Sequence, residues 1–472
     1  MNIIIPDKIK YVMSKLEDAG YQAYIVGGCV RDAVLGREPS DYDVATDARP
    51  EDIARVFEGD KVIDTGSKYG TMTVIHDSVH VEVTTFRCDT NYSDGRHHDY
   101  VRFSDSISDD LFRRDFTINA MAYNEKDGLV DEFGGMRDIE RKRIRTVENA
   151  YRVFGEDALR ILRAIRFSSS LGFEIEEKTK AAVFTEKESI LTSVSPERIQ
   201  KELEGILTGV NVENVLREYV AVLGVVIPEI LPMVGFDQRT PYHIYDVWEH
   251  TIRVVAGMPA DPVSRLAGLF HDIGKPPCFI QGEDGVGHFF GHPEMSCEIA
   301  ADIMWRLKFD NKTRSDVLTL VKWHDLRPEE SEKAVRKVIM KVTPELFDKW
   351  ISIKRADNRA QAPMVADRQS GISEVERIGH ELIASEGALS LKTLRINGQD
   401  IMSLGVTEGP DVGRIMSALL ECVLEEEIPN DHDELMARAR EIVVSSSAIH
   451  VKSDPLEDES LEKQPFVWEN LT

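Results

Sequence analysis

The sequence predicts a small α/β domain followed by a long, nearly all-helical region. Short apolar segments alternate with helical segments over residues 1–145, whereas helical periodicity continues almost without strand candidates from Glu148 onward. A stretch rich in proline and glycine, residues 224–243, then divides the helical region. At 472 residues the chain is long enough for about three domains of roughly 150 residues each.

Each element of the first domain follows from a local pattern. Residues 1–20 read as an amphipathic helix that Gly20 closes, and residues 50–57 as a second helix. Residues 21–26 and 41–47 read as strands, with a short helix between them from about residue 30 to 35. Residues 71–77 and 79–87 read as paired strands that turn at Asp77-Ser78.

Composition restricts the class of protein. Hydrophobic residues make up 42% and charged residues 30%, which is typical of a folded chain. The first residues lack the pattern of a signal peptide, and no apolar run approaches the length of a membrane span, so we expect no membrane association. The five cysteines are scattered and form no CxxC pair. A disulfide framework or zinc ribbon is therefore not expected, and a reducing cytoplasm is the predicted location.

Net charge is −26, which argues against a protein that binds nucleic acid over its whole surface. Local basic patches remain compatible with this charge, because salt screens charges beyond about 8–10 Å. Two basic clusters stand out: Arg137, Arg141, Lys142, Arg143 and Arg145, and then Arg152, Arg160, Arg163 and Arg166.

The strongest local pattern is GGCVRD followed by DYD, which contains Gly27, Gly28, Arg31, Asp32, Asp41 and Asp43. Residues i and i+2 of a strand point to one face, so Asp41 and Asp43 are expected to converge. Mg²⁺ suits such a pair, because it takes one or two carboxylates and completes its shell with water and phosphates. The two glycines allow backbone amides to approach a triphosphate. Glu82, on a neighbouring predicted strand, is a candidate third carboxylate.

Three further motifs follow in order: RRDFTINAMAY (113–123), FGGMRDIERKRIRTV (133–147) and GEDALRILRAIRF (155–167). A fourth, SPERIQKEL (195–203), reads as a capped helix. With the glycine and DYD motifs, they make residues 20–210 resemble the class II tRNA nucleotidyltransferases and the related bacterial poly(A) polymerases. The resemblance implies an α/β head of the polymerase-β nucleotidyltransferase type over 1–145, and a helical neck and body over 146–235.

The resemblance also implies roles for individual residues. Asp41 and Asp43 would bind the catalytic Mg²⁺ ions, and Arg114 and Asp115 would contact the nucleotide ribose. Asp157 and Arg160, in an EDxxR pattern that begins at Glu156, would act as an amino-acid template, and their spacing predicts one shared helix face. An aspartate accepts from the amine of cytosine or adenine, whereas guanine and uracil present a carbonyl there. Further nucleotide- or RNA-binding arginines would be Arg160, Arg163 and Arg166.

Two segments bear on the reaction. Poly(A) polymerases of this family usually carry a basic GRRF-type stretch after the DxD strand, where this chain has VIDTGSKYGTMTVI. Residues 86–103 resemble the flexible loop of enzymes that switch from C to A, with Arg87, Asp94 and Arg96 as its working residues. The sequence therefore predicts stepwise addition of C, C and A to the tRNA acceptor end from CTP and ATP. A poly(A) polymerase or an A-adding enzyme remains the alternative.

A second constellation lies between residues 246 and 357: His250, His271, Asp272, His292, His324 and Asp357. Imidazoles with carboxylates suit a divalent metal. Residues 240–360 resemble the HD superfamily of metal-dependent phosphohydrolases. The resemblance implies His250, His271, Asp272 and Asp357 as ligands of a first metal. His292 and His324 would serve a second metal or the substrate phosphate, which Lys275 could hold.

This second resemblance suggests a phosphatase or 2′,3′-cyclic phosphodiesterase that repairs tRNA ends. A hydrolase that uses the head only to bind RNA is the remaining alternative. The predicted domain order is completed by the HD domain at 236–360, a helical tail at 361–450 and a loose acidic C-terminus at 451–472.

Overall fold

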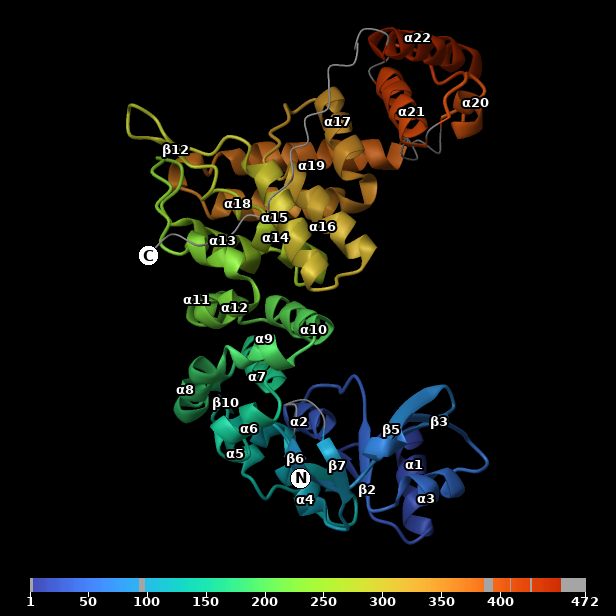
Figure 1. Cartoon of the computed structure of the whole chain (residues 1–472), viewed down its shortest axis with the longest axis vertical. Coiled ribbons are helices and arrows are strands. Elements are labelled where there is room, and N and C mark those ends of the chain that lie inside the picture. The colour runs from blue at the N-terminus through green and yellow to red at the C-terminus, as the bar shows by residue number, and fades with distance from the viewer. Residues whose placement is uncertain (1–2, 93–97, 386–393, 408, 425–426, 451–472) are drawn as a thin grey trace, which may run out of the picture. The chain divides into compact units, whose positions relative to one another are not determined.

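The structure is a computed structural model that describes residues 3–92, 98–385, 394–407, 409–424 and 427–450 (Figure 1). The chain forms two compact units. The first unit comprises Met1–Leu326 and Asp348–Ile372, and the second comprises Arg327–Phe347 and Ser373–Thr472. The finer division into five parts stays a prediction.

A mixed seven-stranded sheet forms the N-terminal part of the first unit (Figure 1). The strand order is β3-β4-β5-β2-β1-β8-β9; β2 and β5 run parallel, and the other neighbours are antiparallel. Its strands are β1 (Ala23–Val26), β2 (Asp43–Thr46), β3 (Lys61–Gly66), β4 (Thr71–His76), β5 (Val79–Thr85), β8 (Ala122–Asn124) and β9 (Gly128–Val130). All four residues of β1 are buried, as a central strand requires.

Three helices accompany these strands: α1 (Asp7–Asp18), α2 (Gly28–Val34) and α3 (Pro50–Val56). The apolar residues of α1 recur at helical spacing and are buried, namely Ile9, Val12, Met13 and Leu16. The predicted hairpin is confirmed, because β4 and β5 pair on either side of Asp77 and Ser78, which both adopt positive φ. The sequence did not predict β3, whose residues are mostly exposed and lack an apolar alternation.

A second hairpin, β6 (Arg87–Tyr92) and β7 (His98–Phe103), occupies the segment that was predicted as a flexible loop. The remaining elements that lead into the helical region are α4 (Ile107–Phe112), the 3₁₀ turn η2 (Thr117–Asn119), α5 (Gly135–Glu140) and β10 (Arg143–Ile144). Strand β10 pairs in parallel with β11 (Glu174–Ile175).

The helical region begins where the sequence predicted it. Its first helices are α6 (Ala150–Glu156), α7 (Leu159–Leu171), α8 (Glu177–Glu186), α9 (Ser189–Ser193), α10 (Pro196–Leu207), α11 (Val212–Glu218) and α12 (Val220–Val226). The stretch rich in proline and glycine contains the end of α12, the 3₁₀ helix η3 (Pro228–Met233) and the loop that leads to the next helix. The break between helices is therefore confirmed.

The helices after this break carry the histidine and aspartate residues of the second constellation or end directly before them. They are α13 (Val247–Gly257), α14 (Pro262–Phe270), α15 (His292–Arg306), α16 (Asn311–Trp323) and α18 (Phe347–Arg359). A short hairpin of β12 (Ile280–Gln281) and β13 (Gly287–His288) lies between α14 and α15.

The second unit contains α17 (Glu332–Val342), most of α19 (Arg368–Ser385), α20 (Gly398–Met402), α21 (Gly409–Leu424) and α22 (His432–His450). The last three helices share a core around Ile401, Leu419 and Leu435, each of which is fully buried. None of the helices in the described ranges is both long and apolar enough to cross a membrane.

Candidate nucleotide-binding site and metal centre

A cavity of about 560 Å³ opens where the sheet meets α7 and α10. It is rich in charge, because carboxylates and arginines supply most of its walls. Its lining residues include Gly27, Gly28, Arg31, Asp32, Asp41, Asp43, Arg114, Asp115, Asn119, Asp157, Arg160, Arg163, Arg166, Phe167 and Arg198. Sequence motifs that lie up to about 170 residues apart therefore meet in one place.

The glycine motif forms the turn between β1 and α2. Gly27 adopts a φ of 78°, which favours glycine, and a Cβ there would lie 2.7 Å from Nη1 of Arg114. The turn can therefore lie this close to Arg114 only with glycine at position 27. Arg31 points from α2 to Asn119, whose Oδ1 accepts a hydrogen bond of 2.7 Å from Nη1.

The acidic pair is placed differently from the prediction in one respect. Asp43 begins β2, opposite Val26 and Glu82, but Asp41 precedes the strand and so does not share a strand face with Asp43. Asp41 and Asp43 still line the same cavity, whereas Glu82 is exposed and lies outside its lining. Burial raises the pKa of Asp43 to about 6. The carboxylates of Glu82 and Asp41 also raise this pKa, whereas the charge of Arg114 lowers it. An additional positive charge nearby would favour the ionised form of Asp43.

The second motif places an anion–cation network on the opposite wall. Arg163 donates through Nε to Oδ2 of Asp115 at 2.7 Å, and Arg114 pairs with buried Asp110 at 3.0 Å. Burial alone would raise the pKa of Asp115, but Arg163 and Arg160 overcome it and lower the pKa to about 2. Asp115 is therefore an ionised hydrogen-bond acceptor at the cavity wall.

The residues expected to act as a template do not share a helix. Asp157 ends α6 with an extended backbone (φ −147°), and Arg160 lies in the first turn of α7. The carboxylate of Asp157 instead accepts 2.7 Å and 3.5 Å hydrogen bonds from Arg198 of α10. Arg160 is held by Glu156 at 3.0 Å and by the carbonyl of Arg113. The expectation of one shared helix face was therefore wrong, although both residues line the cavity.

Three arginines of the cavity contact the aromatic ring of Phe167. The guanidinium carbons of Arg31, Arg163 and Arg166 lie 5.2, 5.4 and 4.5 Å from the centre of the Phe167 ring. Such contacts allow neighbouring cations to share a small volume. Arg166 is also paired with Glu202 of α10 at 2.6 Å.

The predicted loop residues are only partly placed. Arg87 lies at the start of β6 and donates to the carbonyl of Tyr69 at 2.5 Å, whereas Asp94 and Arg96 lie outside the described residues.

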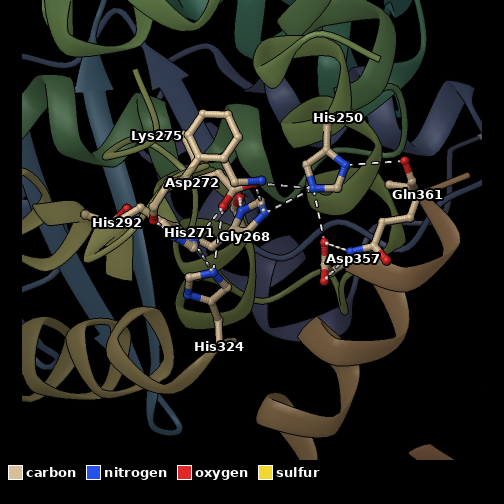
Figure 2. A network of polar contacts seen from close by, with 12 residues as sticks. His250, Gly268, His271, Asp272, Lys275, His292, His324, Asp357 and Gln361 are labelled. Carbon is tan, nitrogen blue, oxygen red and sulfur yellow. Dashed lines mark hydrogen bonds and ion pairs between the residues drawn. The ribbon is translucent and has the colours of Figure 1, made fainter. Parts of the chain in front are cut away.

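The second constellation does converge, as Figure 2 shows. Two groups have ligand atoms that all lie within 4.8 Å of one another: His250, His271 and Asp272, and Asp272, His292 and His324. Elsewhere in the described ranges no third such group occurs, and Asp41, Asp43 and Glu82 do not form one. The helices α13, α15 and the ends of α14 and α16 supply these side chains.

Backbone carbonyls orient all four imidazoles. The Nδ1 atoms of His271, His292 and His324 lie 2.8, 2.9 and 2.6 Å from the carbonyls of Gly268, Phe289 and Val321. Nδ1 of His250 lies 3.3 Å from the carbonyl of Ala360. A neutral imidazole that donates from Nδ1 carries its lone pair on Nε2. Each ring therefore presents Nε2 as a potential metal ligand.

These Nε2 atoms face one another in pairs around Asp272. The pair from His250 and His271 is 3.4 Å apart, and the pair from His292 and His324 is 3.2 Å apart. The first pair approaches Oδ2 of Asp272 at 3.4 and 3.1 Å, and the second approaches Oδ1 at 3.4 and 3.7 Å. Two lone pairs at this distance repel unless a proton or a metal ion lies between them. The donor set therefore fits a divalent metal on each side of Asp272.

Two charged residues complete the cluster. Asp357 approaches Nε2 of His250 at 3.1 Å, and Lys275 pairs with Asp272 at 2.7 Å while donating to Gln238 at 2.9 Å. Burial opposes the ionisation of Asp272, but His271 and Lys275 hold its pKa well below the usual range. Burial also opposes the ionisation of Asp357, but its contact with His250 lowers its pKa below the usual value, so the cluster contains two ionised carboxylates in a buried setting.

Sequence reasoning missed three neighbours of this cluster. Gln238 holds Lys275, Gln361 donates to Asp357, and the ring of His243 lies 4.9 Å from that of His250. The buried Nδ1 of His243 has no hydrogen-bond partner, and burial lowers its pKa to about 3. His243 stands seven residues before His250, a spacing that carries no metal-site pattern, so only the fold brings it here.

Family models match three parts of the chain. Residues 23–145 match the model described as a poly A polymerase head domain. Residues 172–230 match a probable RNA and SrmB-binding site of polymerase A, and residues 289–439 match a putative tRNA nucleotidyltransferase domain 2. Each model covers less than half of the chain.

Two curated relatives are named CCA-adding enzyme. The one from Bacillus pumilus is 48% identical over 192 residues, which are 41% of this chain and 47% of the relative. The one from Lactobacillus delbrueckii subsp. bulgaricus is 47% identical over 191 residues, which are 40% of this chain and 48% of the relative. The chain thus spans about half the length of the curated relatives it matches.

Likeness in fold extends further than likeness in sequence. The crystal structure of Bacillus stearothermophilus CCA-adding enzyme in complex with CTP matches 94% of this chain and 100% of its own, with 27% identity and a TM-score of 0.66. This likeness and the sheet and helices described above confirm the predicted fold class of an α/β head followed by helices. The chain is therefore similar to CCA-adding enzymes over nearly all of its fold.

Proposed function

We propose that this chain adds C, C and A stepwise to the 3′ end of tRNA from CTP and ATP. The observation that carries the proposal is the charged cavity in which the glycine turn, Asp41, Asp43 and the arginines of α7 meet. The family models and the likeness to CCA-adding enzymes support the same reaction class.

The cavity residues suit the separate parts of this reaction. Asp41 and Asp43 would hold Mg²⁺, which when bound supplies positive charge to the attacking and leaving oxygens. Asp115 is an ionised acceptor that can receive a hydrogen bond from the ribose 2′-hydroxyl. The turn at Gly27 and Gly28 offers backbone amides and space to the triphosphate.

Base selection falls to Asp157 and Arg160 in this proposal. The carboxylate would accept from the exocyclic amine of cytosine or adenine, and the guanidinium would donate to ring acceptors of the same base. Guanine and uracil present a carbonyl to Asp157, so they leave two acceptors facing each other. Such a mismatch inside a closed site is costly.

Single-nucleotide incubation tests the reaction. A tRNA that lacks CCA should incorporate labelled CTP alone, and ATP only after CTP, whereas UTP and GTP should give little product. Incorporation of ATP without CTP on any RNA 3′ end would favour a poly(A) polymerase. Addition of A only to tRNA that already ends in CC would favour an A-adding enzyme.

Paired substitutions test the acidic site. Asp41→Ala and Asp43→Ala should each lower nucleotide addition by at least about 10³-fold, because each removes a carboxylate that would hold the catalytic Mg²⁺. Asp18→Ala, an exposed carboxylate outside the cavity, should leave addition unchanged. Retained activity in Asp41→Ala and Asp43→Ala would contradict the assignment and favour a head that only binds RNA.

We also propose that the second constellation is a divalent-metal centre for hydrolysis of phosphoesters at RNA ends. The facing Nε2 pairs on either side of Asp272 favour this proposal. His250, His271, Asp272 and Asp357 would hold one ion, and His292 and His324 with Asp272 would hold a second. A bound metal supplies an activated water for attack on phosphorus.

Metal analysis and hydrolysis assays test the centre independently of nucleotide addition. The purified chain should bind Mn²⁺ at the histidine groups, and in an Asp41→Ala background Asp272→Ala should abolish the remaining binding, because it removes the carboxylate common to both groups. Release of phosphate from a 3′-phosphorylated RNA, or opening of a 2′,3′-cyclic phosphate, should be lost in the same variant. Metal binding without hydrolysis would leave a structural centre.

A further inference from the structure

A three-residue segment directly after α18 touches two side chains of the metal centre at once. Ala360 offers its carbonyl to Nδ1 of His250 at 3.3 Å. Gln361 donates through Nε2 to both oxygens of Asp357, at 3.1 and 3.0 Å. Figure 2 shows the amide of Gln361 and the ring of His250 both directed at the carboxylate of Asp357.

The side chain of Gln361 has little freedom. The residue is 8% exposed, and its spacing of four from Asp357 turns the amide back toward the end of the helix. Oε1 is buried without a hydrogen-bond partner, so the carboxylate is the group that orients the amide. The reverse orientation would set Oε1 against Asp357 and repel it.

The segment is itself anchored. The amide N–H of Gln361 donates to the carbonyl of Asn358 at 3.2 Å, and that of Ala362 donates to the carbonyl of Tyr242 at 2.8 Å. Tyr242 belongs to the loop that leads into α13, the helix that bears His250. The contact therefore ties the end of α18 to the segment before α13.

We propose that residues 360–362 are a positioning device for the metal centre, in which Gln361 sets the carboxylate of Asp357 and Ala360 sets the ring of His250. Asp357 and His250 are the ligands of one half of the centre, so this device acts on the ion beside His250 and His271. The inference rests on the proposed metal centre. Partners behind metal ligands fix ligand orientation, and their loss typically weakens metal binding about 10–100-fold.

Titration of the full-length chain with Mn²⁺ by calorimetry tests the role of Gln361 without any assay of activity. Gln361→Ala should weaken binding at one site about 10–100-fold and leave a second site unchanged. Gln361→Asn, whose amide is one methylene shorter, should show the same selective loss. At a given Mn²⁺ concentration, Gln361→Glu should show the lowest occupancy of that site. A second carboxylate then replaces the amide that donates to Asp357.

Gln369→Ala is the matched control. Gln369 donates its amide to the carbonyl of Arg355 and to Asn358 in the same helical region, and neither of these bonds involves Asp357 or His250. Its substitution should leave both Mn²⁺ affinities within about twofold of the unmodified chain. Far-UV circular dichroism of each metal-free variant separates loss of fold from loss of positioning.

The outcomes are distinct. Unchanged Mn²⁺ affinity in folded Gln361→Ala would overturn the inference while leaving the metal centre intact. Equal weakening in Gln361→Ala and Gln369→Ala would also overturn it, because a general loss of packing would then explain the result. In an Asp41→Ala background, which removes a carboxylate of the proposed head site, the absence of Mn²⁺ binding would overturn the metal centre and this inference together, without bearing on nucleotide addition.

Discussion

Ion pairs at single residues determine the charge and shape of the cavity beside the sheet. Arg198 is the clearest example, because it holds Asp157 with two hydrogen bonds although 41 residues separate them. Arg198→Ala should therefore leave Asp157 mobile, raise the KM for CTP about tenfold and increase UTP incorporation. Steady-state kinetics with each nucleotide measures both effects. Arg377→Ala, which removes an exposed ion-pairing arginine from α19, is the control; equal UTP incorporation in both variants would contradict the prediction.

Asp110 leads to a prediction about pH. Its side chain is fully buried and pairs with Arg113 and Arg114 at 2.7 and 3.0 Å. Burial opposes ionisation, but the two arginines together lower the pKa of Asp110 below its usual value. The folded pKa thus lies below the unfolded value of about 3.9, so its stabilisation is present above that value and is lost as pH falls through the folded pKa.

Asp110→Asn should accordingly cost about 3–5 kcal/mol at pH 7, because two cations lose their buried partner. Urea unfolding at pH 7 and at pH 3 measures the difference in midpoint between the variant and the unmodified chain. The difference should shrink at pH 3. Asp18→Asn, at an exposed site, should show no such pH-dependent difference. If the difference in urea midpoint between Asp110→Asn and the unmodified chain were the same at both pH values, the charge of Asp110 would not be involved.

Local sequence patterns predicted the identity of the site residues better than their contacts. The turn at Asp77 and Ser78 and the lining of the cavity by Asp41 and Asp43 follow from short motifs. The pairing of Asp157 with Arg198 does not, because it depends on how α6 ends and where α10 packs. The same limit explains why Gln361 gave no signal: an isolated glutamine has no spacing pattern.

At the scale of elements, the close packing of α7 against α10 positions the arginines of the cavity. A Cβ on Gly209 would lie 2.5 Å from the carbonyl carbon of Ser169, and Oγ of Ser169 donates to the carbonyl of Ile206 at 2.6 Å. The hydroxyl oxygen and the backbone carbonyl group of Ser169 both block that space. The two helices can therefore keep this separation only with glycine at position 209.

Gly209→Ala should destabilise the chain by about 1–3 kcal/mol through overpacking. It should also lower CTP incorporation, because Arg163 and Arg166 lie on α7. Thermal unfolding and the incorporation assay measure the two effects. Gly155→Ala in α6 is the matched control, since a Cβ there meets no atom within 4 Å, and it should be neutral or slightly stabilising. Similar losses in both variants would argue against a specific α7–α10 contact.

Residues 86–103 show how element type and sequence composition can differ. The resemblance to a flexible loop predicted irregular structure here, but residues 87–92 and 98–103 pair as antiparallel strands. Backbone hydrogen bonds between β6 and β7 can form whatever the side chains are, provided that a turn joins them. A pattern of apolar alternation was therefore not required for this hairpin.

At the scale of the whole molecule, the proposed nucleotide site and the proposed metal centre use separate residues. Asp41→Ala should abolish nucleotide addition and leave Mn²⁺ binding by the histidine groups intact. Asp272→Ala should do the opposite, because it removes the carboxylate common to both groups. Incorporation of CTP and calorimetric Mn²⁺ titration, applied to both variants, measure this independence. Loss of both properties in either variant would show that the two sites are coupled.

The pairing of Lys275 with Asp272 has a practical consequence for handling the protein. The ammonium group is an internal counter-ion, so the buried carboxylate keeps a positive neighbour when a chelator strips the divalent ions. Preparation in EDTA should thus yield chains whose helices remain assembled and accept fresh ions on dialysis. Removal of that ammonium by Lys275→Met would leave an uncompensated negative charge among four imidazoles, and storage without metal would then become harmful.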